Sequence, residues 1–226
     1  MEVSAAQADT AEQAPTKRMG RAERRDQILA AATRAFARSG FVGTGLDDIA
    51  AEAGVSRAIL YRHFDTKHDL YRDVLGRVCD RLATAVGEGP GGFTEAAIDS
   101  LIAAAAADPD GFRLLFRHVR REPEFRDFAD TFEAGMTKAA HRQIAVLVSD
   151  TTWAQWASQL APVIAIESII AWLDVGRPDP EQVSHGIRQA IHGIVTAAQH
   201  GLTAPTDYRH RIRSADLRPD GCGPER

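Results

Sequence analysis

The segment from Leu46 to Phe64 constrains the fold of this chain most strongly, because small, turn-forming, capping and apolar residues stand in it at fixed spacings. Ala50 is small enough for a second helix to approach closely, and Gly54 can adopt the positive φ that a tight interhelical turn requires. Ser56 can cap the following helix, which leaves Arg57 in its first turn. The apolar residues beneath are Leu46, Ile49, Ala53, Val55 and Leu60. This spacing predicts a helix-turn-helix.

Helical periodicity continues on both sides of this segment, and no stretch shows the sustained alternation of a strand. A first helix is expected from Arg21 to about Gly40, a plausible stop. Capping boxes at residues 44–47 and 66–69 predict two further helix starts. Later helices are predicted over about 67–86, 94–107, 109–121 and 123–148, followed by two apolar helices that include residues 163–173 and 183–195. The fold class is therefore all-α, with a three-helix head and a larger helical body.

Composition suggests four parts of the chain. Residues 1–19 contain almost no large apolar groups, so we expect a disordered arm. Residues 20–67 form the predicted helix-turn-helix domain, and residues 68–202 form the predicted helical body. Residues 203–226 are rich in Asp, Arg, Pro and Gly and are expected to be a flexible tail. A single compact domain remains the alternative for a chain of 226 residues.

The charges are distributed unevenly between these parts. The whole chain has a formal net charge of −4. Residues 17–67 contain ten Lys or Arg and six Asp or Glu, a net of +4, which leaves −8 for the rest. Such asymmetry suits a protein that places one end on phosphates while the rest is repelled from them. A solvated charged face is the alternative interpretation.

Residues 51–70, AEAGVSRAILYRHFDTKHDL, resemble the DNA-binding signature of the TetR family of transcription regulators. The detailed match covers about residues 24–75, and the remainder matches only in helix order and in its two apolar terminal helices. The resemblance implies that Tyr61 and Lys67 touch the DNA backbone, and that Arg57, Ala58 and Arg62 face the groove. Gly45 departs from the family, which often has Thr or Ser there, so a backbone contact at this position is in doubt.

The complete set of expected DNA-binding residues is Thr44, Ser56, Arg57, Ala58, Tyr61, Arg62, His63 and Lys67. Lys67 would lie at the amino end of a helix, where free amides and the helix dipole favour phosphate. Arg57 and Arg62 can read guanine or pair with phosphate, and the sequence does not choose between these roles. Thr44 and Ser56 have an alternative role as helix caps, and His63 as a residue packed on Phe64.

The two apolar helices near the end contain more apolar residues than the core of one subunit needs. We therefore predict a homodimer with a symmetric four-helix interface. Its expected residues are Ile166, Ile169, Ile170, Leu173, Val183, Ile187, Ile191 and Ile194.

Aromatic residues between about Phe112 and Trp156 suggest either packed core or the walls of a pocket for an apolar or amphipathic small molecule. Arginines and histidines in the same region could receive an acidic head group. Pro162 indicates that a helix begins nearby or that a longer helix kinks. The predicted pocket residues are Phe112, Phe116, Arg120, Phe128, Phe132, His141, Trp153 and Trp156.

Other classes of site have little support. The chain contains no nucleophile elbow, phosphate loop, dinucleotide fingerprint or zinc-protease motif, so we expect neither an enzyme nor a cofactor. His185 and His192 share a helix face but have no third ligand at suitable spacing, so no metal is expected. The amino end has no signal-peptide core, and no apolar run approaches the length of a membrane span, which predicts a cytoplasmic protein.

These features together predict a ligand-responsive DNA-binding regulator, a repressor that a small molecule releases from a palindromic operator. Two recognition helices roughly 34 Å apart would enter successive major grooves, and a ligand would change their spacing. Two other classes stay open at this point. One is a helical ligand-binding or chaperone-like module whose basic head serves solubility or protein contacts, and the other is a helical enzyme with scattered catalytic residues.

Overall fold

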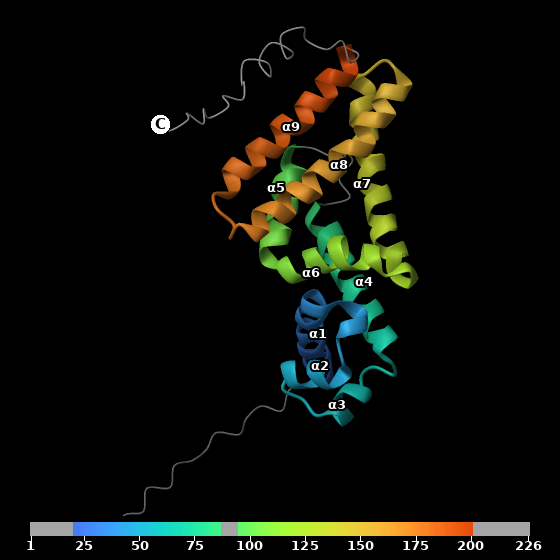
Figure 1. The fold of residues 1–226 in the computed structure, drawn as a ribbon, viewed down its shortest axis with the longest axis vertical. Helices are drawn as coiled ribbons and strands as arrows, with labels where there is room; N and C mark the ends of the chain where they lie inside the picture. The colour runs from blue at the N-terminus through green and yellow to red at the C-terminus, as the bar shows by residue number, and fades with distance from the viewer. Residues whose placement is uncertain (1–19, 87–94, 201–226) are drawn as a thin grey trace, which may run out of the picture. The chain divides into compact units, whose positions relative to one another are not determined.

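A computed structural model describes residues 20–86 and 95–200 (Figure 1). Within these residues every regular element is a helix, which confirms the all-α prediction. The chain divides into two compact units, Met1–Val74 and Leu75–Arg226, called the head and the body below. The predicted arm at 1–19 and the predicted tail at 203–226 lie outside the described residues.

The head contains α1 (Arg21–Gly43), α2 (Leu46–Glu52), α3 (Arg57–Tyr61) and the first turns of α4 (Lys67–Val86). Its core consists of fully buried large side chains from all four helices: Ile28, Phe36, Ile49, Leu60, Leu70 and Tyr71. Gly40 leaves the helical conformation with a φ of 69°, as expected of a stop, but the chain adds one more turn to Gly43. The interdigitation of large side chains explains why such short helices hold their positions.

The turn between α2 and α3 has the predicted chemistry. Gly54 adopts a φ of 63°, a left-handed conformation that a side chain would strain. Ser56 is the N-cap of α3, and its Oγ accepts a hydrogen bond from the Ile59 N–H at 3.3 Å. These two residues fix the direction in which α3 leaves the turn.

The two predicted capping boxes have different outcomes. At the start of α4, Thr66 Oγ1 accepts a hydrogen bond from the Asp69 N–H at 3.0 Å, as predicted. The box expected at residues 44–47 is wrong by one residue, because Gly45 is the N-cap of α2 and Asp48 accepts the Gly45 N–H at 2.9 Å. The Thr44 hydroxyl instead donates to the Gly40 carbonyl at 2.7 Å.

The body begins within α4 and continues through α5 (Glu95–Ala107) and α6 (Pro109–Arg113). The single helix predicted over 109–121 changes type along its length, since a π-helical turn, η1 (Leu114–His118), and a 3₁₀ turn, η2 (Val119–Arg121), follow α6. Another 3₁₀ turn, η3 (Pro123–Phe125), precedes α7 (Arg126–Leu147). π-helical turns are rare and often lie at functional positions.

The last two helices are α8 (Thr151–Asp174) and α9 (Pro180–His200), and α8 packs mainly against α7 and α9. Pro162 is buried inside α8, so the alternative in which a helix begins near it is wrong. The helix begins earlier because Asp150 Oδ1 accepts the N–H groups of Thr152 and Trp153. By length and composition alone α8 could span a membrane, but 56% of its apolar window is buried by neighbouring helices, as in a core helix.

Candidate functional site

The exposed side of α3 brings together four of the predicted DNA-binding residues. Arg57, Ala58 and Tyr61 of α3 and its C-cap residue Arg62 are all exposed. Leu60 anchors the opposite side of α3 in the head core and is completely buried. The arrangement presents two arginines and a tyrosine on one anchored surface.

Arg57 is held by its neighbours in the free head. Its Nη1 donates to both carboxylate oxygens of Asp47 on α2, at 2.9 and 3.1 Å, and its Nη2 lies 3.3 Å from the Tyr61 hydroxyl. The hydrogen bond with Tyr61 and the charge of Asp47 raise the pKa of Arg57. Sequence reasoning assigned Asp47 to a helix cap and missed its contact with the recognition helix. The spacing of ten residues between Asp47 and Arg57, on either side of a tight turn, was the only feature of the sequence that could have indicated this contact.

Lys67 is the first residue of α4, at the predicted helix start, but its side chain contacts the end of α1. Its Nζ donates to the main-chain carbonyls of Phe41 and Thr44, at 2.8 and 3.0 Å, and lies 4.3 Å from the centroid of the Phe41 ring. The Thr44 side chain is buried, and its hydroxyl points to the Gly40 and Ala35 carbonyls. In the free head Lys67 therefore hydrogen-bonds to the end of α1. Contacts of Thr44 and Lys67 with DNA remain predictions.

His63 is half-buried and surrounded by arginines. Burial, together with the positive charges of Arg21, Arg25, Arg62 and Arg24, lowers the pKa of its imidazole. The predicted packing on Phe64 is present, with the two ring centroids 6.4 Å apart. The guanidinium groups near His63 are a favourable environment for phosphate.

The α1 arginines in this cluster were not among the predicted DNA contacts. Arg25 is the best anchored, because it donates to the His63 carbonyl at 3.1 Å and pairs with Asp73 at 2.5 Å. Its guanidinium also lies 4.5 Å from the centroid of the Phe64 ring. The sequence could have indicated this cluster, since Arg21, Arg24 and Arg25 stand at i, i+3 and i+4 on one side of α1.

The aromatic residues predicted to line a pocket pack mostly against one another. Phe112 and Phe116 are buried with ring centroids 4.7 Å apart, and the ring of Phe132 lies 5.7 Å from that of Phe116. The rings of Trp153 and Trp156 form an edge-to-face pair at 5.6 Å. Phe128 is half-buried. The packed-core alternative therefore describes the buried phenylalanines.

The polar members of the predicted pocket have protein partners. Arg120 pairs with Glu133 at 2.5 Å, and His141 Nδ1 lies 3.2 Å from the Ser158 hydroxyl. Of all eight predicted residues, Phe112 alone lines one of the three cavities described next.

Three cavities in the body lie beside alanines, which in two of them come from neighbouring helices that face each other. A cavity of about 380 Å³ between α4, α5 and α6 is lined by Ala85, Ala104 and Ala107, among others. A second, of about 200 Å³, lies between α5, α7, α8 and α9 beside Ala140 and Ala161. The third and largest, of about 680 Å³, lies between α5 and the corner from α8 to α9. Methyl side chains fill little of the space between helices, which explains these positions.

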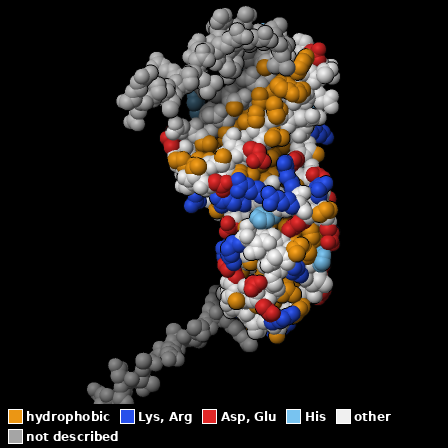
Figure 2. Space-filling model, in the orientation of Figure 1, with side chains coloured by type: hydrophobic (Ala, Val, Ile, Leu, Met, Phe, Trp, Pro, Cys, Tyr) orange, Lys and Arg blue, Asp and Glu red, His pale blue; other side chains and the backbone are white. Residues whose placement is uncertain are grey.

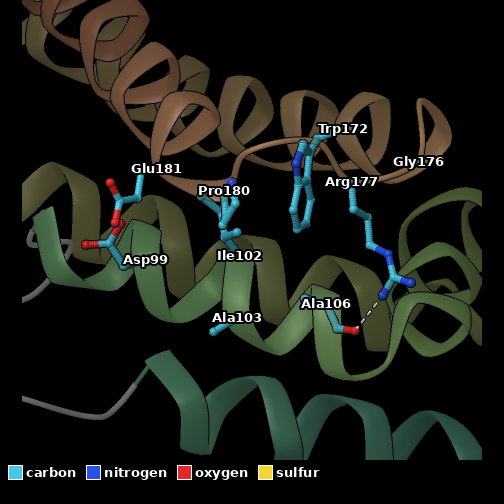
Figure 3. A pocket seen from close by; sticks show the side chains of 9 residues that line it. All are labelled: Asp99, Ile102, Ala103, Ala106, Trp172, Gly176, Arg177, Pro180 and Glu181. Atoms are coloured by element: carbon cyan, nitrogen blue, oxygen red, sulfur yellow. Dashed lines mark hydrogen bonds between the residues drawn. The ribbon is translucent and has the colours of Figure 1, made fainter.

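The largest cavity has two differently charged ends (Figure 3). Asp99 and Glu181 lie together at one end, and Arg177 reaches down at the other end to the Ala106 carbonyl, 3.1 Å from its Nη1. Trp172 enters between these ends from the α8 side. The cavity combines an apolar floor with an acidic end.

Five of the eight residues predicted for the dimer interface lie inside the subunit, and the interface itself remains a prediction. Ile166, Ile169, Ile170, Leu173 and Ile187 are buried in the core of the chain itself. Val183, Ile191 and Ile194 are half-buried. The apolar residues that α8 exposes are instead Trp156 and Val163. The sequence predicted α8 and α9 as helices but did not predict which side of each is exposed.

Among residues 20–86 and 95–200, no three His, Cys, Asp or Glu side chains are placed to hold a metal ion. His185 and His192 are both exposed on α9.

Comparison with known proteins follows the division into head and body. Residues 28–74 match the family model described as "Bacterial regulatory proteins, tetR family". Over 197 residues the chain is 30% identical to the HTH-type transcriptional activator FasR of Mycolicibacterium smegmatis, covering 82% of this chain and 86% of that protein. The chain belongs to the TetR family. It is thus a helix-turn-helix transcription regulator and not an enzyme, as predicted.

Two further similarities fit the TetR family. The HTH-type transcriptional repressor SCO4008 of Streptomyces coelicolor is 38% identical over 90 residues, which are 40% of this chain and 46% of that protein. A TetR-like regulator from Rhodococcus sp. RHA1 superposes with a TM-score of 0.62 at 19% identity, covering 81% of this chain and all of that one. The structural likeness shows that the body, as well as the head, has the fold of a TetR regulator.

Proposed function

We infer that this TetR-family regulator acts in the cytoplasm as a homodimer, and that a small molecule bound in the body releases it from a palindromic operator. The observation that carries this proposal is an apolar strip over α8 and α9, visible as the oblique orange band in Figure 2. A surface of this kind on a monomer is a site for another protein surface.

On α8 an apolar row lies on the exposed side, flanked by the exposed polar residues Gln155 and Gln159. Trp156, Leu160 and Val163 follow one another at i, i+4 and i+7, with Trp156 and Val163 exposed by 36% and 40%. Glu167 continues this row as its charged member. Burial of the apolar part against a second copy would remove it from water.

On α9 the matching strip consists of small residues. Gly186, Ala190 and Gly193 are exposed at i, i+4 and i+7. Side chains this small let two helices approach closely. Two copies of α8 and α9 related by a twofold axis would form a four-helix interface, as predicted, but with other residues at its centre.

The ligand response is supported by the contact of one cavity with α4. Val78, Leu82 and Ala85 of α4 line the cavity of about 380 Å³, and the same continuous helix begins in the head at Lys67. Arg81 on α4 pairs with Asp108, the N-cap of α6, at 3.2 Å. A ligand that enlarges this cavity would bias the position of α4, and hence the spacing of paired heads.

The turn after α6 is tied to α8 by a second set of ion pairs. Asp174 at the end of α8 accepts from Arg113 of α6 and Arg117 of η1, at 3.1 and 2.6 Å. These pairs bridge the π-helical turn, where the helical hydrogen bonding is already irregular. We propose that this region rearranges when ligand binds.

Repression is the proposed outcome of DNA binding, because a dimer seated on an operator obstructs transcription from it. Activation is the second candidate, since FasR, which is similar over 82% of this chain, is named as an activator. Transcription in vitro from a promoter with the operator placed upstream or overlapping separates these outcomes.

The dimer is tested by Val163→Glu, which puts a charge in the apolar strip without touching the core. We expect sedimentation to show monomers with normal helicity and operator affinity reduced at least a hundredfold, because a single head makes half of the contacts. Gln155→Glu is the matched control, as it changes an exposed α8 residue on the neighbouring flank. A Val163→Glu protein that remains a dimer with unchanged operator affinity would contradict the proposed interface.

A further inference from the structure

The cavity of about 200 Å³ in the body has an apolar interior and a basic rim. Its apolar walls include Ala140 and Ile144 of α7, Ala161 of α8, and Ile191 and Val195 of α9. The surrounding core cluster contains Ala154, Ala157 and Ala198 as well, so three neighbouring helices present mostly methyl groups to each other. A ligand that fills such a space gains contacts that the small side chains do not provide.

The polar rim consists of Arg188 and His192, one turn apart on α9, together with Gln143 on α7. All three can donate hydrogen bonds, and Arg188 has a permanent positive charge. None of the residues lining this cavity is an Asp or Glu. The chemistry of the rim therefore favours an anionic group, and a carboxylate fits a guanidinium best by geometry.

The other two cavities have acidic residues in their linings. Asp99 and Glu181 line the largest cavity, and the paired residues Arg81 and Asp108 line the cavity beside α4. A ligand carboxylate would meet a like charge in both places. The smallest cavity is thus the one of the three that suits an organic acid.

Arg188 is oriented by Asp99, which lies on the side of the largest cavity. Arg188 Nη2 pairs with Asp99 Oδ2 at 2.5 Å, and Asp99 Oδ1 accepts from the Ser184 hydroxyl at 2.5 Å. Figure 3 shows Asp99 beside Glu181, so an acidic patch lies behind this ion pair. The five N–H groups of a guanidinium allow it to serve a second carboxylate without leaving the first. Asp99 is therefore a positioning residue for Arg188.

The rim also lies away from the strip proposed for dimerisation. Arg188 and His192 are each two residues from Ala190, which places them roughly 200° around α9 from it. Two subunits packed through Gly186, Ala190 and Gly193 would leave this rim on the other flank of the helix.

We propose that this cavity binds a small apolar monocarboxylic acid, with its carboxylate on Arg188 and His192 and its hydrocarbon part against Ala140, Ala161 and Ile191. The binding site stands on the cavity and its rim. Its role as an effector site rests on the proposal above that a ligand in the body releases DNA. No α4 residue lines this cavity, so its effect on α4 would pass through α5, whose Ile98 lines this cavity and whose Ala104 lines the cavity beside α4.

Calorimetric titration of the full chain with benzoate and octanoate tests the site directly. We expect saturable binding of at least one acid, and binding at least tenfold weaker of benzyl alcohol and octanol, which lack the carboxylate. Arg188→Gln should weaken acid binding at least tenfold, and Arg188→Lys should restore part of it. Arg142→Gln, an exposed arginine next to Gln143, is the matched control and should change nothing.

Arg188→Gln also breaks the ion pair with Asp99, so two further variants obstruct the cavity without changing that pair. Ala161→Leu fills the interior from α8, and Ile191→Phe fills it from α9 if the first variant folds poorly by circular dichroism. Either folded variant should bind neither acid. Absence of binding of both acids to the wild-type chain, or equal affinity for wild type and Arg188→Gln, would overturn the proposal.

Operator binding measured with and without the acid separates the site from its regulatory role. Acid binding that depends on Arg188 and lowers operator affinity supports both proposals. Acid binding that depends on Arg188 but leaves operator affinity unchanged supports the site and contradicts its role as an effector site. Release of DNA by an acid that acts equally on Arg188→Gln contradicts this site and leaves the ligand response standing.

Discussion

The head and the body of this regulator fill their interiors in different ways. Leu60, Phe36 and Tyr71 occupy the head core as large, fully buried side chains from separate helices. The body also buries large rings such as Phe112, but between other helices alanines face each other, Ala140 opposite Ala161 and Ala85 opposite Ala104, and leave cavities. The first kind of packing holds a short recognition helix in one position, and the second leaves room for a molecule. The comparison shows that, in two units built only of helices, the volume of the buried side chains decides whether a unit is rigid or has room to bind a small molecule.

The largest effect is expected when the head loses a large side chain. Leu60→Ala removes the completely buried anchor of α3 and should destabilise the head by about 3 kcal/mol, within the range for leucine truncations. Urea unfolding followed by circular dichroism should show an early transition of the head, while the melting of the body stays unchanged. A single, unshifted transition would contradict the view that Leu60 anchors α3.

A matched pair of substitutions on α5 tests the packing of the body. Ala104 lines the cavity beside α4, whereas Ala105 is completely buried in the core. Ala105→Leu should cost about 1–3 kcal/mol by overpacking, and Ala104→Leu should cost less than about 1 kcal/mol or stabilise the body. Thermal unfolding of the two variants measures the difference. Equal losses would mean that the cavity is not available to a larger side chain.

Lys67→Ala should combine a modest loss of stability with a change in DNA binding. Its ammonium group donates to two carbonyls at the end of α1, so the head should lose about 1 kcal/mol. If Lys67 also contacts phosphate when DNA is bound, the slope of log affinity against log salt should fall by about one unit. If the variant lost stability but kept the same salt slope, Lys67 would have a structural role and no contact with phosphate.

The smallest effect concerns the protonation of His63. Its pKa is lowered in the folded head by burial and by the surrounding arginines, so the unfolded chain takes up a proton more readily. Stability from this residue is therefore present above the ordinary pKa of 6.5 and is lost as the pH falls below it. His63→Gln should flatten this pH dependence of head unfolding between pH 7 and 5. An identical pH dependence in the variant would assign it to other groups.

The sequence was most informative where backbone geometry demands a particular residue. Gly54 with its positive φ and Ser56 at an N-cap could be assigned from residue type and spacing, and both lie where predicted. The one-residue error at Thr44 arose because its hydroxyl was attracted by a carbonyl of the preceding helix. Local rules do not include such competition between neighbouring helices.

The body was less predictable because composition does not determine which side of an apolar helix is buried. The apolar residues of α8 surround it almost completely, so Ile166 and Val163 were indistinguishable before packing was known, yet one is buried and the other exposed. Aromatic residues suggested a pocket, but large rings fill space and the cavities formed beside alanines instead. Asp47 and Arg57 met through a tertiary contact that no periodicity indicates.

Selection of bound sequences from random DNA tests the central claim most directly, because it asks whether paired heads read bases through α3. The wild-type chain should enrich a palindrome whose half-sites are about one helical turn apart. Arg57→Ala should alter the preferred base at one position of each half-site while the palindrome persists. Enrichment of no common sequence, or an identical preference in the Arg57→Ala variant, would contradict the account.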